Sequence, residues 1–169
     1  MADGEVLSRQ SQAQAAVLLN HALRLEYAAV VHLERLAGTV QDAHSRYCLF
    51  LLSAESIDHA VKTASVIREL GGTPDWRMWT PPDAGTLSRL FRAQLAREII
   101  CRGIYGKAAR LMPGGVLARS CAALAEDEGR HIEMVEKALS ALSLTEPPDC
   151  PPEHGAAAGM PVSSAVGAL

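Results

Sequence analysis

Four segments of the chain each place a carboxylate within an apolar face at helical spacing, and two of these segments also place a histidine there. In the last segment, Glu128 and His131 follow Leu124 at steps of four and three residues, which is the spacing of one helix face. Burying a charge on such a face is costly unless the charge is paired or coordinated. Carboxylates and imidazoles together suit iron or manganese. The candidate metal ligands are Glu26, Glu55, His59, Glu98, Glu128 and His131.

The two halves of the chain repeat this pattern. An offset of 72 residues, from position 26 to position 98, carries Glu55 onto Asp127 and His59 onto His131. A single glutamate in an apolar stripe is more often a residue at the edge of the core than a ligand. Recurrence in four segments is harder to explain in that way. Six ligands around two metals is an arrangement that a helical bundle builds at its centre.

Proline and glycine divide the chain into the segments that must position these residues. No proline precedes Pro74, and after Pro82 only Pro113 interrupts the chain before position 147. Because helix interiors tolerate proline poorly, long helices are predicted at about residues 8–37, 41–70, 86–112 and 116–142. Short links within the first pair and within the last pair favour antiparallel hairpins. Residues 73–85 are long enough for a crossover, so the sequence predicts an all-α four-helix bundle of two antiparallel hairpins.

Composition places these helices in one domain. The chain has 169 residues, 49% of them hydrophobic but only 4% aromatic, which favours packed helices over a β-sandwich. We expect the bundle to occupy residues 1–144 and a flexible tail rich in Pro, Gly and Ala to occupy residues 145–169. A net charge of −3 gives no reason to expect a nucleic acid or a membrane as partner. With neither a signal-peptide pattern nor a membrane-length apolar run, a cytoplasmic protein is predicted.

Several other residues lead to expectations about packing. Tyr27 and Tyr105 are expected either near the metals or as hydrogen-bonded core residues. Trp76 and Trp79 are expected to hold the crossover against the bundle. Gly103 and Gly106 lower helix stability, which indicates close helix packing or a contact between copies of the chain. A homodimer or larger homo-oligomer is therefore predicted.

Four segments carry a resemblance to a known group of proteins, which spans about residues 15–142. They are LLNHALRLEYAAVVHLERLAG, SAESIDHAVKTASVIRELGGTPDW, AREIICRGIYGKAARL and AALAEDEGRHIEMVEKAL. The chain resembles the ferritin-like superfamily, and within it the rubrerythrins and bacterioferritins. The resemblance implies a ferritin-like bundle with a carboxylate-bridged di-iron site that reacts with dioxygen or peroxide as an oxidase, peroxidase or ferroxidase. It implies two irons per chain, with a single iron or manganese as alternatives.

The resemblance also assigns roles to individual residues. Glu26 and Glu98 match the ligands of the first and third helices, and His59 matches the histidine of the second. Glu128 and His131 match the Glu-x-x-His motif of the fourth helix, in which the glutamate bridges the metals. The chain has no Cys-x-x-Cys pair from which to build the rubredoxin-type iron site of complete rubrerythrins, so a separate electron donor is implied.

One position departs from the pattern of the group. Three residues before His59 the group has a second bridging glutamate, whereas this chain has Ser56. Glu55 is the adjacent residue, so it either turns into the site or leaves one metal position weakened or lost. The competing hypothesis is a non-catalytic metal-binding or structural bundle in which Ser56 marks a degraded site.

Overall fold

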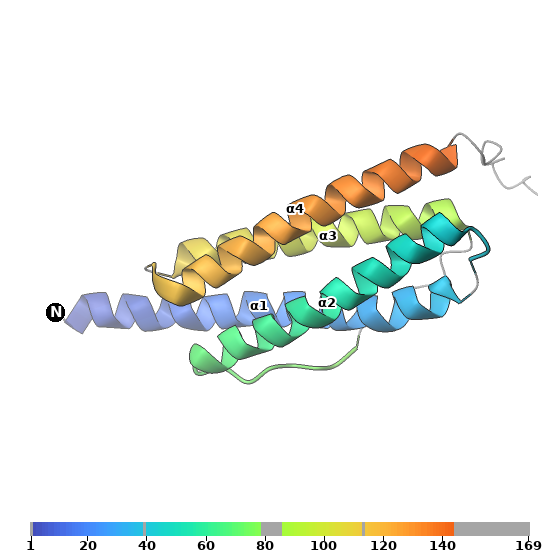
Figure 1. Ribbon diagram of the computed structural model, residues 1–169. Coiled ribbons are helices and arrows are strands. Elements are labelled where there is room, and N and C mark those ends of the chain that lie inside the picture. The colour runs from blue at the N-terminus through green and yellow to red at the C-terminus, as the bar shows by residue number, and fades with distance from the viewer. Residues whose placement is uncertain (1, 39, 79–85, 113, 144–169) are drawn as a thin grey trace, which may run out of the picture.

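The computed structural model describes residues 2–38, 40–78, 86–112 and 114–143, and within these it describes side chains for residues 9–142. Four helices account for most of this length, and no strand occurs among the described residues (Figure 1). The helices are α1 (Ala2–Ala37), α2 (Ala43–Glu69), α3 (Leu87–Leu111) and α4 (Gly115–Ser143). The predicted all-α fold is confirmed. The first helix begins at Ala2, earlier than predicted, and no proline interrupts residues 2–8. The predicted tail, residues 145–169, lies outside the described residues.

Short polar residues and glycines fix where the helices begin and end. Asp42 caps α2 by accepting a hydrogen bond from the Ser45 amide at 2.6 Å, and Thr86 caps α3 in the same way. Both side chains satisfy amide groups that the first turn of a helix leaves without partners. At the end of α2, Gly71 takes a φ of 77°, a left-handed conformation that glycine adopts without steric cost. These boundaries fix the register in which each helix presents its polar residues.

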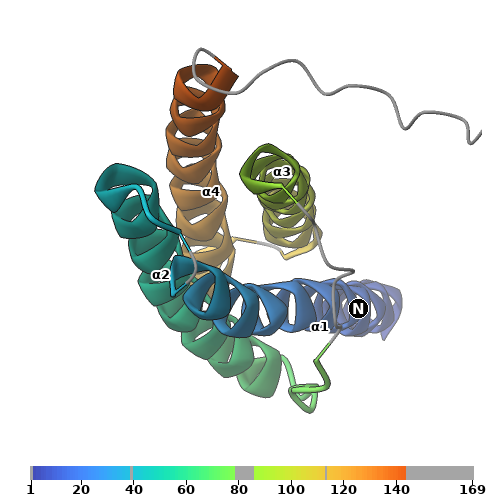
Figure 2. The same cartoon turned by 90° about the vertical axis from the view of Figure 1, so that its right-hand side faces the viewer.

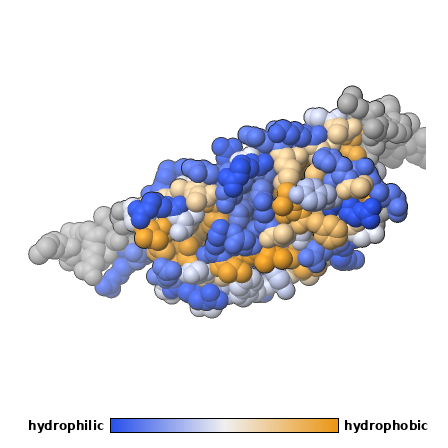
Figure 3. All heavy atoms as spheres, in the orientation of Figure 1, coloured by the Kyte–Doolittle hydropathy of each residue, from blue (hydrophilic) through white to orange (hydrophobic). Residues whose placement is uncertain are grey.

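The helices pack as two hairpins. α1 lies beside α2 and α3 beside α4, and the hairpins meet mainly through α1 and α3, whereas α2 and α4 share the fewest contacts (Figures 1 and 2). The side between α2 and α4 is therefore the least tightly closed side of the bundle. Polar and apolar residues are mixed on the surface that Figure 3 shows. No helix in the described part of the chain is long and apolar enough to cross a membrane.

The first part of the predicted crossover runs against α1. Trp76 meets Tyr27 edge-on, with 5.8 Å between ring centroids. Asn20 holds both sides of this segment, because its amide donates to the Thr73 carbonyl at 3.0 Å and its oxygen accepts from the Asp75 amide at 2.7 Å. The expectation that Trp76 holds the crossover against the bundle agrees with these contacts. Residues 79–85, and with them Trp79, lie outside the described part of the chain.

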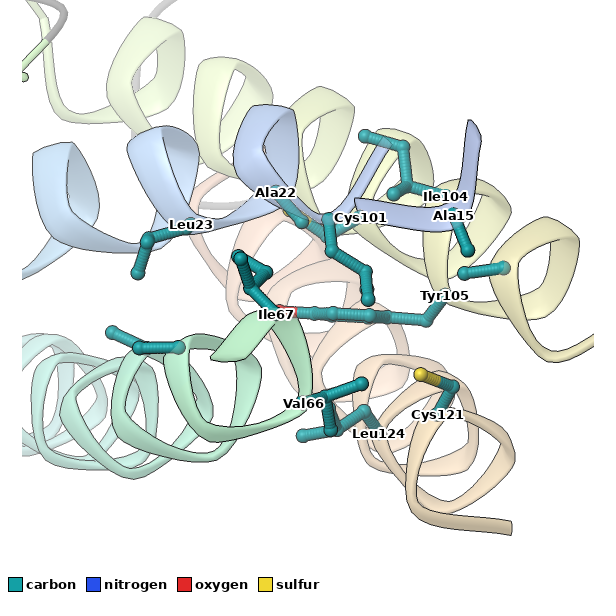
Figure 4. Close-up of a cluster of buried hydrophobic side chains, with 14 of the residues drawn as sticks. Ala15, Ala22, Leu23, Val66, Ile67, Cys101, Ile104, Tyr105, Cys121 and Leu124 are labelled. Carbon is teal, nitrogen blue, oxygen red and sulfur yellow. The ribbon is translucent and has the colours of Figure 1, made fainter. Parts of the chain in front are cut away.

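Two apolar clusters fill the bundle, one on each side of its middle. The first contains Leu23, Ile67, Tyr105 and Leu124 among others, and Figure 4 shows Tyr105 reaching from α3 into it. The second is formed by residues nearer the other end of the bundle, including Leu33, Leu49, Leu52, Phe91 and Val135. On every helix, the candidate ligands fall between the residues of the first cluster and those of the second. The core is therefore an apolar–polar–apolar stack with the polar layer at mid-length.

The two helical glycines do not mediate close packing within the chain. A Cβ atom placed on Gly103 would meet nothing within 4 Å, and one on Gly106 would meet only the end of the Arg110 side chain. The expectation of tight helix packing at these positions is therefore not met inside one chain. A contact between copies of the chain stays a prediction.

Candidate metal centre

Five of the six candidate ligands converge in the polar layer, and all four helices contribute. α1 supplies Glu26, α2 supplies His59, α3 supplies Glu98, and α4 supplies both Glu128 and His131. Each of these five side chains is buried. Glutamate and histidine are seldom buried without partners, so their convergence needs a specific explanation. The helix spacing read from the sequence brings them to one level of the bundle.

Glu128 lies between two imidazoles that face it with equivalent atoms. His59 Nδ1 lies 2.8 Å from Glu128 Oε1, and His131 Nδ1 lies 3.7 Å from Glu128 Oε2. The two rings are stacked, with centroids 5.2 Å apart and an interplanar angle of 22°. Each inner nitrogen also faces one further acid, because His59 Nδ1 lies 3.6 Å from Glu26 and His131 Nδ1 lies 3.3 Å from Glu98. The centre thus has two related halves that share Glu128.

The outer nitrogens of the same imidazoles face two further carboxylates. His59 Nε2 lies 3.5 Å from Asp127 Oδ2, and His131 Nε2 contacts Glu55 Oε2. Glu55 and Asp127 are the pair that the offset of 72 residues relates, so the repeat in the sequence corresponds to a repeat in space. A carboxylate at the outer nitrogen of a metal-binding histidine fixes the ring orientation and the tautomer. Glu55 therefore contacts the rim of the centre through His131 and does not join the inner group.

Ser56 occupies the position that breaks the repeat. It is only 2% exposed, and the same offset relates it to Glu128. The centre consequently contains three inner carboxylates, and at the position of a fourth it has a short hydroxyl side chain. This difference follows from a single residue of α2 and leaves the helix itself undisturbed.

A second layer of polar side chains supports Glu26 and Glu98. Tyr105 donates a hydrogen bond to Glu26 Oε1 at 3.0 Å, and Thr63 bonds to the Tyr105 hydroxyl at 2.9 Å. Of the two tyrosines considered in the sequence, Tyr105 is a hydrogen-bonded core residue beside a candidate ligand. Tyr27 lies at the surface against Trp76.

On the opposite half, the Gln94 amide donates to Glu98 Oε1 and the Arg97 guanidinium donates to the Gln94 carbonyl oxygen. Arg97 is only 6% exposed. In the sequence, Gln94 lies on the same helix stripe as Glu98, and Thr63 lies on the stripe next to that of His59, whereas no sequence pattern marks Arg97 as part of the centre. A buried guanidinium next to the ligand set changes the charge of the centre.

The protein environment shifts the proton affinities of the two imidazoles. Burial by itself lowers the pKa of His59, but its hydrogen bonds to Glu128 and Glu26 outweigh burial and raise this pKa to about 10. His131 behaves in the same way. Burial lowers its pKa, but its bonds to Glu128 and Glu98 outweigh burial and raise this pKa to about 11. Burial among other acids raises the pKa of Glu128. Without a metal, the cluster therefore retains protons that the separate groups would lose.

The residues of the centre fit a cation. Glu128 is fully buried, and its Oε2 is the one buried side-chain oxygen or nitrogen without a hydrogen-bond partner among the described residues. An unpartnered buried carboxylate oxygen is unfavourable, and coordination to a cation would satisfy it. His59, Glu128 and His131 place one ligand atom each within 4.8 Å of one another.

The Tyr105 hydroxyl gives a direct test of the supporting layer. We expect Tyr105→Phe to lower the free energy of unfolding of the metal-free protein by about 1–3 kcal/mol, because Glu26 loses a buried hydrogen-bond donor. Urea denaturation followed by circular dichroism measures this change. Tyr47→Phe, on the exposed face of α2, is the matched control and should leave stability unchanged. Equal stability of the two variants would contradict the assigned role of the hydroxyl.

Comparisons with known proteins agree at the level of the fold. No protein-family model and no curated protein matches the chain. Among solved structures, it is similar to the Desulfovibrio desulfuricans bacterioferritin, studied for its di-iron site in different catalytic states, with a TM-score of 0.70 and 19% identity over 82% of this chain and 85% of that one. It is also similar to the Rhodobacter capsulatus bacterioferritin with a metal-free dinuclear site and haem iron, with a TM-score of 0.63 and 22% identity over 78% of this chain and 87% of that one. The chain has the ferritin-like four-helix fold.

Proposed function

We propose that this chain is a non-haem iron protein whose buried centre reacts with dioxygen or peroxide, as an oxidase, peroxidase or ferroxidase. The observation that carries the proposal is Glu128, a fully buried carboxylate with one oxygen toward each of two imidazoles and no hydrogen bond to Oε2. Mixed carboxylate and imidazole ligands suit iron. The ferritin-like fold agrees with this reading, because both bacterioferritins it resembles are described with di-iron or dinuclear sites.

Each residue of the centre has a role in this proposal. His59, His131 and Glu128 would hold the metal, with Glu26 and Glu98 beside them. Bound iron would supply the electrons that reduce the oxidant. The apolar clusters above and below the polar layer exclude bulk water from it.

The residues around the ligands orient them and hold protons. Asp127 and Glu55 hold the outer nitrogens of the two imidazoles, which keeps Nδ1 of each ring directed inward. Tyr105 holds a proton against Glu26. We also propose that the electrons that return the iron to its reduced state come from a separate donor protein.

Anaerobic loading with ferrous iron followed by peroxide tests the proposal. We expect each equivalent of bound iron to be oxidised within seconds, with a new absorption band in the near ultraviolet, and peroxide to be consumed in repeated turnovers when a chemical reductant is present. Protein treated with a chelator is the control and should be inactive. Iron that binds tightly but does not accelerate peroxide consumption over free iron would contradict the proposal.

A second function is favoured by one specific observation. Ser56 and the buried guanidinium of Arg97 both reduce the negative charge of the centre, as expected if the bundle binds a metal for structure and not for turnover. This alternative predicts that a redox-inactive divalent ion such as Zn²⁺ raises the melting temperature as much as iron does, and that iron shows no turnover. The resemblance implies two irons per chain, but this chain has Ser56 where that group has a second bridging glutamate.

A further inference from the structure

We infer that the centre holds a single divalent cation, bound by His59, Glu128 and His131, and that Ser56 is the residue that sets this number. The inference deepens the proposed function and rests on it for metal binding alone. It replaces the expectation of two ions per chain. Three observations support it: the charge of the buried layer, the existing partners of Glu26 and Glu98, and the spacing of the ligand atoms.

The charge of the buried layer balances one divalent ion. Glu26, Glu98 and Glu128 contribute three negative charges and Arg97 contributes one positive charge, all four side chains being at most 6% exposed. The remainder is two negative charges, which one divalent cation neutralises. A second ion would leave net positive charge in a dry interior, where uncompensated charge is strongly unfavourable. A glutamate at position 56 would lower this excess, but Ser56 provides no charge.

The carboxylates at the rim do not change this balance. Asp127 is paired with Arg130 on the same helix, so its charge is compensated at the surface. The Glu55 side chain is 45% exposed, and water screens its charge. Both acids face the outer nitrogens and not the inner group.

The two acids that would complete separate metal positions already have other partners. Glu26 accepts the Tyr105 hydroxyl. Glu98 accepts the Gln94 amide, and Arg97 stands behind Gln94. At the positions that the offset of 72 residues relates to Gln94 and Arg97, the first half of the chain has the apolar residues Ala22 and Leu25. The guanidinium is therefore an asymmetric addition to the Glu98 half, and it weakens the attraction of that half for a second cation.

The remaining three ligands suit one ion. Their ligand atoms lie within 4.8 Å of one another, close to the span of about 4.2 Å that two bonds of about 2.1 Å give across a metal. Two histidines and one carboxylate on a single iron form a set that leaves coordination positions open for further ligands.

Metal counting on the full chain tests the inference. The protein is made metal-free, titrated anaerobically with Fe²⁺ and in parallel with Mn²⁺ by calorimetry, and the bound metal is measured after desalting. We expect about one ion per chain for the natural sequence and for Ser56→Ala. Ser56→Glu supplies the missing carboxylate and is expected to bind about two. Ser65→Glu adds the same charge on an exposed turn of α2 and should leave the number at one.

The outcomes separate this inference from the proposed function. Two ions per chain in the natural protein would overturn the single-ion assignment and leave the proposed function standing. One ion without peroxide or dioxygen turnover would overturn the proposed function and leave the assignment standing. No bound metal at all would overturn both. If Ser56→Glu folds but still binds one ion, the role given to Ser56 is overturned; if it does not fold, the count on the natural protein decides the single-ion assignment.

Discussion

Glu128→Gln is expected to abolish high-affinity metal binding. The amide keeps the size and shape of the glutamate, but it removes the one charge that both imidazoles face. Loss of residues that only orient metal ligands typically costs 10- to 100-fold in affinity. Loss of the central carboxylate should therefore weaken binding by about 100-fold or more. Calorimetric titration with Mn²⁺, which avoids oxidation during the measurement, gives the dissociation constant directly.

A matched variant and a fold check make this result interpretable. Glu133→Gln makes the same chemical change on an exposed position of α4, and it should bind Mn²⁺ as the natural protein does. Circular dichroism should report unchanged helix content for both variants, since an amide fits the space of a carboxylate. If Glu128→Gln binds within a few-fold of the natural affinity, the metal does not lie between His59 and His131.

Metal-free protein is expected to lose stability as the pH rises from 6.5 toward 10, and bound metal is expected to reverse this trend. The pKa of His59 is raised from 6.5 to about 10 and that of His131 to about 11 by their carboxylate partners. Between these limits the folded state binds more protons than the unfolded state, so the free energy of unfolding falls with pH. The contribution is complete below pH 6.5 and is lost as pH approaches 10–11.

Binding of a metal requires neutral imidazoles, so it competes with these protons and strengthens as the pH rises. Each additional bound proton changes the free energy of unfolding by at most about 1.4 kcal/mol per pH unit. Two additional protons over two pH units amount to at most about 5.6 kcal/mol, so without metal the melting temperature is expected to fall by up to roughly 10–20 °C between pH 7 and pH 9. A metal at 1,000 times its dissociation constant adds about 4 kcal/mol.

Thermal unfolding with a chelator and with excess Mn²⁺, across the same pH series, measures both effects. His21→Gln changes an exposed histidine of α1 and should preserve both curves. Replacement of His131 by glutamine should flatten the metal-free curve and remove the stabilisation by Mn²⁺. A melting temperature of the metal-free protein that stays constant or rises from pH 7 to pH 9 would contradict the conclusion that His59 and His131 retain protons in the folded state.

The sequence alone was sufficient for the fold and for the composition of the inner site. Proline and glycine mark the helix ends because they act locally on the backbone, which is why the predicted helices agree with α1 to α4 except at the beginning of α1. Helix periodicity placed the inner residues of the site on inward faces near the middle of the predicted helices; these residues are Glu26, His59, Glu98, Glu128 and His131. Each of these inferences depends on neighbours within a few turns of one helix.

The tertiary structure decided which atoms meet. Whether Glu55 joins the inner group or holds the outer nitrogen of His131 depends on the separation and rotation of α2 and α4, which no single helix determines. Two other contacts also depend on how the helices pack. Asp127 faces His59, and Tyr105 donates to Glu26. The sequence thus determined the fold and the kinds of side chains at its centre. The packing of the helices determined their partners, and with them the charge available to a metal, because electrostatic balance in a buried layer depends on distances between residues far apart in the chain.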